Sequence, residues 1–171
     1  YQERALLVEG NKVIVRFKET FKSDSMYKVF FLTLLTSGIG YGIYKGIVDT
    51  YLAEIVVMSE FARGVAEFFR ELPGLLLALV LAVAYTRTAE TLYKVGAIVT
   101  VVGLGLQTFV PADRVWVTLA IFVYSFGEHI QIGMKNTLSL EYSQTNKGGA
   151  ALGLQNSISQ IGTLAGFFVI V

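Results

Sequence analysis

Long apolar runs alternate with short polar breaks along most of the chain. A membrane-spanning helix needs about 20 consecutive, mainly apolar residues, and runs of that length recur here. We predict five transmembrane helices, at about residues 29–51, 61–85, 92–110, 115–136 and 148–171. The breaks are short, so consecutive helices should run antiparallel. The predicted fold class is all-α, a polytopic transmembrane helix bundle.

The bundle is expected to occupy residues 27–171, preceded by a cytoplasmic accessory segment at 1–26. Within that segment, residues 5–21 fit either a small hairpin or an interfacial amphipathic stretch. Lys and Arg are concentrated in the segment and in the turns at 86–94 and 135–147. Because cytoplasmic loops carry an excess of these residues, the N-terminus is expected in the cytoplasm.

Composition supports a membrane protein. Apolar residues make up 54% of the chain and charged residues 16%, with a formal net charge of +1, whereas an average soluble domain is about 25% charged. The small net charge argues against a nucleic-acid partner, which requires a concentrated basic face. The chain has no cysteine and one histidine, which leaves no material for thiolate nucleophiles or zinc clusters. We expect no enzymatic activity, cofactor or metal.

Glycines spaced four residues apart occur on two predicted helices. They are Gly38, Gly42 and Gly46 on the first span, and two pairs on the fifth, Gly149 with Gly153 and Gly162 with Gly166. Glycines at this spacing form a smooth ridge against which a second helix can pack closely. Glycine is also common in membrane helices for no packing reason, which is the alternative. Two ridges favour a tightly packed bundle.

Tyr41, Lys45 and Asp49 recur at the same spacing on the first span, about 60° around the helix from the glycine ridge. They are interpreted as one polar wall of a cavity. The alternative is that Lys45 and Asp49 neutralise each other and extend toward the membrane interface.

Arg63, Glu67, Arg70 and Glu71 share one stripe of the second predicted helix. One explanation for Arg63 and Glu67 is that this end of the helix extends beyond the lipid, so that their charges lie in water. It explains Arg70 and Glu71 less well, because the membrane-embedded remainder of the helix would be too short to span. We therefore expect Arg70 and Glu71 to point into the bundle, with Arg70 within reach of a carboxylate such as Glu67, Glu71 or Asp49.

Pro73 adds to this interpretation. It lacks a backbone N–H, so the carbonyl of Phe69 loses its helical donor. Such a carbonyl is tolerated at membrane depth mainly where protein or cavity water can satisfy it. The stretch EFFRELPG at 67–74 therefore predicts charge facing a wet interior.

Glu128 and His129 interrupt the fourth predicted helix. A single buried histidine is often a hydrogen-bonded structural group. The functional alternative is a proton-coupling or substrate-binding pair, since histidine titrates near neutral pH and desolvation raises the pKa of a carboxylic acid toward it. Adjacent residues lie about 100° apart on a helix, so both need not reach the same cavity.

The stretches FARGVAEFFRELPGLLLALV at 61–80 and YSFGEHIQIGMKNTLSL at 124–140 resemble the second and fourth helices of a bacterial branch of the major facilitator superfamily. Together with the cytoplasmic N-terminus and the short turns, they make the chain similar to the amino-terminal six-helix half of such a transporter. The superfamily's turn motif between helices two and three would fall at 82–94, where Arg87 is the only match.

The resemblance implies alternating access by two six-helix halves, with helices one, two, four and five bordering a central path. The expected substrate- or ion-binding residues are Tyr41, Lys45, Asp49, Glu67, Arg70, Glu71, Glu128 and His129. The expected partners are the lipid bilayer, a small-molecule substrate and a second half that follows Val171.

Two functions remain open from the sequence. The first is secondary active transport of a small solute, with protons as the candidate coupling ion, in the cytoplasmic membrane. The second is a non-transporting membrane sensor or scaffold, in which the charges form structural pairs between helices. A membrane-embedded hydrolase has little support, because no catalytic motif is present.

Overall fold

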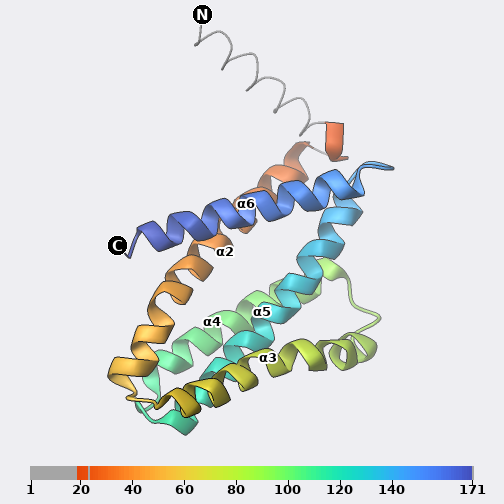
Figure 1. The fold of residues 1–171 in the computed structure, drawn as a ribbon. Coiled ribbons are helices and arrows are strands. Elements are labelled where there is room, and N and C mark those ends of the chain that lie inside the picture. The colour runs from red at the N-terminus through yellow and green to blue at the C-terminus, as the bar shows by residue number, and fades with distance from the viewer. Residues whose placement is uncertain (1–18, 23, 171) are drawn as a thin grey trace, which may run out of the picture. The chain divides into compact units, whose positions relative to one another are not determined.

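The computed structural model describes residues 19–22 and 24–170, and helices occupy most of that length (Figure 1). The elements are α2 (Asp24–Thr50), a π-helical turn η1 (Tyr51–Ile55), α3 (Glu60–Val83), α4 (Ala89–Phe109), α5 (Arg114–Tyr142) and α6 (Gly148–Phe168). Each predicted span corresponds to one of these helices, so the all-α fold class is confirmed. The predicted hairpin or amphipathic stretch at 5–21 lies almost entirely outside the described residues.

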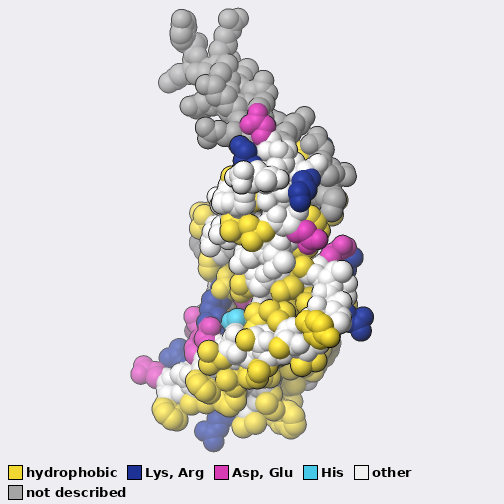
Figure 2. Space-filling model, turned by 90° about the vertical axis from the view of Figure 1, so that its right-hand side faces the viewer, with side chains coloured by type: hydrophobic (Ala, Val, Ile, Leu, Met, Phe, Trp, Pro, Cys, Tyr) yellow, Lys and Arg dark blue, Asp and Glu magenta, His cyan; other side chains and the backbone are white. Residues whose placement is uncertain are grey.

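Three segments of the described chain are long and apolar enough to cross a membrane: Tyr27–Ile55, Ala89–Phe109 and Arg114–Tyr142. These segments support a membrane protein. For α3 and α6 the spanning role stays a prediction. Many large apolar side chains are exposed, among them Leu75 and Phe109, and Figure 2 shows hydrophobic side chains gathered on the visible surface. Such surface suits contact with lipid or with further helices.

The helix starts follow from capping residues in the predicted breaks. The Ser59 side chain accepts a hydrogen bond from the backbone N–H of Ala62 at the start of α3, and that of Thr88 accepts one from Thr91 N–H at the start of α4. Asp113 Oδ1 accepts from Val115 N–H at 2.9 Å before α5. These side chains satisfy backbone donors that a helix start leaves unpaired.

The chain forms two compact units, each of which is described by itself. Unit 1 comprises residues 1–45 and 139–171, and unit 2 comprises 46–138. In unit 1, the first part of α2 crosses α6 (Figure 1). The last turn of α5 also belongs to this unit, where the buried Ser139 hydroxyl donates to Gln155 Oε1 at 2.6 Å.

The crossing of α2 and α6 depends on glycine. A Cβ on Gly42 would run into the carbonyl of Thr163, and Cβ atoms on Gly38, Gly162 and Gly166 would each meet backbone of the opposite helix too. Only glycine therefore permits this separation of the two backbones. The predicted packing ridges are confirmed at these four glycines.

The predicted ridge on the fifth span is wrong at Gly149 and Gly153. A Cβ at either position would meet nothing within 4 Å among the described residues. Gly149 lies in the first turn of α6 and Gly153 one turn later, before the point where that helix reaches α2. Gly153 and Gly162 are nine residues apart, which is about 180° around a helix at 100° per residue. The two glycine pairs therefore lie on opposite faces of α6, and only the face with Gly162 and Gly166 meets α2.

In unit 2, α5 contacts both α3 and α4. Gly127 of α5 lies so close to Gly96 of α4 that a Cβ on either would meet the carbonyl oxygen of the other. Gln131 of α5 donates to the Thr100 hydroxyl of α4 at 2.7 Å. This close packing fixes the rotation of α5 and so determines which of its side chains face α3.

Candidate functional site

Arg70 is the centre of a charged cluster on α3. Its Nε lies 2.7 Å from Glu67 Oε2, its Nη2 lies 2.7 Å from the same oxygen, and its Nη2 lies 3.1 Å from Glu71 Oε1. The Arg70 side chain is only 16% exposed. The expectation that Arg70 pairs with nearby carboxylates is confirmed. Both partners come from its own helix.

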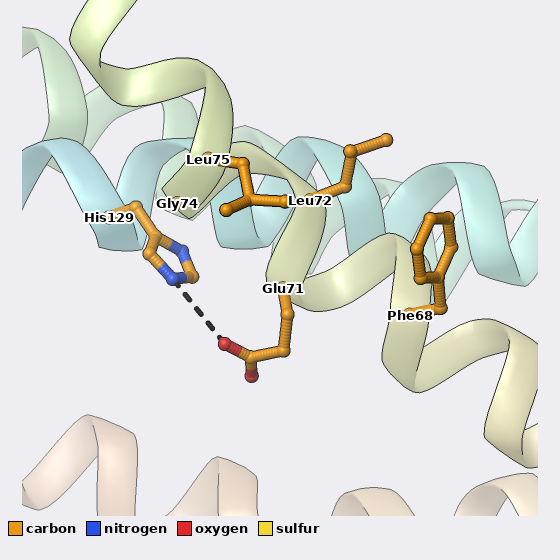
Figure 3. Close-up of a pocket in the computed structure, with 6 residues that line it drawn as sticks. All are labelled: Phe68, Glu71, Leu72, Gly74, Leu75 and His129. Carbon is orange, nitrogen blue, oxygen red and sulfur yellow. Dashed lines mark ion pairs between the residues drawn. The ribbon is translucent and has the colours of Figure 1, made fainter.

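His129 of α5 faces this cluster, as Figure 3 shows. Its Nε2 lies 3.7 Å from Glu71 Oε2. Its Nδ1 lies 2.9 Å from the backbone carbonyl oxygen of Ser125 and 3.0 Å from the Ser125 hydroxyl. The contacts of Nδ1 hold the ring against its own helix and leave Nε2 directed at Glu71.

Ser125 joins α5 to α3 beside Pro73. Pro73 is fully buried inside α3, which continues past it to Val83. The sequence predicted that the carbonyl of Phe69 would need a partner, whereas the Ser125 hydroxyl donates instead to the carbonyl of Arg70. The hydroxyl is completely buried, so the proline-containing turn is packed against protein at this point.

A hollow of about 360 Å³ opens between α3 and α5. It is lined by Phe68, Glu71, Leu72, Gly74, Leu75 and His129 (Figure 3). Ligand pockets usually measure about 300–1,000 Å³ and combine apolar walls with a few polar groups. The size and lining of this hollow suit a small ligand that is mainly apolar and carries one polar or charged group.

Gly74 makes this arrangement possible. A Cβ at Gly74 would lie 2.8 Å from the Cδ2 atom of His129, so a side chain there would push the imidazole away from α3. Pro73 and Gly74 together bring the two helices close enough for His129 to approach Glu71.

Glu128 belongs to the cluster electrostatically but does not line the hollow. Its carboxylate attracts both Arg70 of α3 and Lys135 of α5. Of the adjacent pair Glu128 and His129, only His129 therefore contributes a surface to the hollow. The 100° between neighbouring helix positions accounts for this difference.

The other predicted site residues lie on α2. Tyr41 and Lys45 are half-buried in unit 1, and Asp49 is exposed in unit 2. No ion pair joins Lys45 to Asp49 in the part of the chain that the structure describes, so their mutual neutralisation is not observed. Their role as a cavity wall stays a prediction.

Arg63 differs from Arg70 although both lie on the same predicted stripe. Its Nε is buried and has no hydrogen-bond partner within the described residues.

Among the described residues, the His, Asp and Glu side chains do not form a group of three or more that could hold a metal ion.

Sequence reasoning missed Ser125, Phe68 and Gly74. Ser125 precedes His129 by four residues, a spacing that places both on one helix face and could have indicated it. Gly74 directly follows Pro73, and this dipeptide within an apolar run could have indicated close backbone approach. No comparable signal distinguished Phe68 from the neighbouring Phe69.

Comparison with known proteins found no match, either to a protein-family model, to a curated protein or to a solved structure. The resemblance to the major facilitator superfamily therefore rests on the sequence stretches alone.

Proposed function

We propose that the chain belongs to a secondary active transporter that moves a small solute by alternating access. The observation that carries the proposal is the Arg70 cluster, which lies beside a hollow between two helices otherwise rich in apolar residues. Charged groups are costly within a membrane and are retained there mainly along substrate and ion paths. Protons are the proposed coupling ion, because His129 adjoins Glu71.

The setting proposed for this activity is the cytoplasmic membrane, with the N-terminus in the cytoplasm. A second half that follows Val171 would complete the central path, as in the major facilitator superfamily. Tyr41, Lys45 and Asp49 would contribute from α2.

The alternative is a membrane sensor or scaffold held together by charge pairs between helices. The two closest pairs in the cluster, Arg70 with Glu67 and Arg70 with Glu71, lie within α3 and join it to nothing else. Between α3 and α5, His129 Nε2 lies 3.7 Å from Glu71 Oε2, and the Glu128 carboxylate attracts Arg70. Because the two closest charge pairs lie within one helix, where they add nothing to the contact between helices, we favour transport over the scaffold.

An uptake screen tests the proposal. The protein is reconstituted into liposomes with an imposed pH gradient, and libraries of amines, sugars, amino acids and organic acids are offered. We expect accumulation of one solute class that collapses when the gradient is dissipated. Absence of accumulation and of exchange for every class, with correctly inserted protein, would contradict transport and favour the scaffold.

A further inference from the structure

Arg70 lies among carboxylates from two helices. Its guanidinium group lies 2.7 Å from Glu67 and 3.1 Å from Glu71 of α3, and the Glu128 carboxylate of α5 attracts it as well. Carboxylates at a hollow favour a cationic ligand over an anionic one.

Glu71 is the carboxylate that the hollow exposes. Its Oε1 takes the contact with Arg70, whereas its Oε2 points toward His129 at 3.7 Å, longer than a hydrogen bond. The Glu71 side chain is 63% exposed and lines the hollow. One carboxylate oxygen is therefore accessible to a ligand.

The remaining walls suit the body of an organic ligand. Leu72 and Leu75 supply aliphatic surface, and the Phe68 ring, on a residue that is 61% exposed, lies at the same hollow. An aromatic ring attracts a cation placed over its face. An anionic ligand would instead be repelled by the Glu71 carboxylate.

We propose that this hollow binds a small organic cation with an apolar body, whose charge lies at Glu71 Oε2. The inference deepens the proposed transport function, because it names the class of solute, and it rests on that function for its physiological meaning.

The test uses benzyltrimethylammonium, a permanently charged organic cation with an aromatic body. Binding to the purified protein in detergent is measured by calorimetry at pH 8. Neopentylbenzene, which has the same shape without the charge, should bind at least about tenfold more weakly at pH 8.

Variants assign the effect to the two side chains. Glu71→Gln should weaken cation binding about tenfold or more. Glu60→Gln, in the first turn of the same helix and outside the hollow, is the matched control and should bind as the unaltered protein does. His129→Gln should keep binding, because the Glu71 carboxylate still lines the hollow. Phe68→Leu removes the aromatic ring from the lining of the hollow without changing any charge. It should weaken binding of the cation more than binding of neopentylbenzene.

Equal binding of cation and neutral analogue, or unchanged binding by folded Glu71→Gln, would overturn the proposal. These outcomes are separate from failure of transport. Cation binding without uptake of any solute contradicts the transporter, whereas uptake of other solutes without cation binding contradicts only the ligand class.

Discussion

The hydroxyl of Ser125 on α5 donates a hydrogen bond to the backbone carbonyl of Arg70 on α3. The same Ser125 residue contacts His129 Nδ1 through both its hydroxyl and its carbonyl. One small side chain thus positions both the helix that bears the carboxylates and the histidine that faces them.

Replacing Ser125 with alanine should destabilise the protein by about 1–2 kcal/mol, because a buried hydrogen bond between helices is lost. Thermal unfolding in detergent measures the effect. Ser157→Ala is the control, since the Ser157 hydroxyl is exposed and bonds only to Gly153 of its own helix. Equal stability of the two variants would contradict a structural role for the contact of Ser125 with Arg70.

Arg70→Ala should damage folding or transport more than Arg63→Ala. Loss of Arg70 leaves two carboxylates without their cation, which we expect to cost about 1–3 kcal/mol because both remain partly exposed. Arg63 Nε has no partner to lose. Unfolding temperature and liposome uptake are measured side by side, and the reverse order of effects would mean that the Arg70 cluster is only a solvated helix end.

Alanine at Gly42 or Gly166 should force α2 and α6 apart, at a cost of about 1–3 kcal/mol each, since the added Cβ meets backbone that cannot move aside. Gly40 and Gly153 lie on the same two helices with nothing within 4 Å of an added Cβ. Alanine at these control positions should be neutral or slightly stabilising, because it favours the helix. Thermal unfolding compares the two sets of variants. A similar loss of stability in both sets would contradict the close crossing of α2 and α6.

Gly103→Ala should disturb the packing of α4 on α5. A Cβ at Gly103 would run into the backbone of Tyr124, whereas one at Gly105 would meet nothing within 4 Å. We expect Gly103→Ala to unfold at lower temperature and Gly105→Ala to be unaffected. If α5 moves, binding at the hollow should weaken in Gly103→Ala alone. Benzyltrimethylammonium calorimetry on both variants checks this.

Glu128→Gln should abolish pH-driven uptake while leaving solute exchange intact. Glu128 lies next to His129 in the chain and attracts both Arg70 and Lys135, so we expect its carboxylate to carry the coupled proton. Glu71 would still face the hollow and hold the solute. Uptake is measured with and without a pH gradient in liposomes. An unchanged response to the gradient would exclude Glu128 from proton coupling.

The sequence by itself determined the structural features that depend on residues close together along one helix. Apolar runs of spanning length and the capping residues Ser59 and Thr88 were sufficient to predict the helices, since these signals act within a few residues. The pairing of Arg70 with Glu67 and Glu71 was predictable for the same reason: residues one and three positions apart on a helix can reach each other wherever that helix packs.

Only the tertiary structure decided which faces meet. Gly162 and Gly166 pack against α2 while Gly149 and Gly153, also four residues apart but on the opposite side of α6, do not. Likewise, His129 faces Glu71 while the adjacent Glu128 lines no part of the hollow. A repeat of four residues marks a face, but its register against another helix depends on contacts between residues far apart in the chain. Ser125 with Arg70 is such a contact, at a separation of 55 residues.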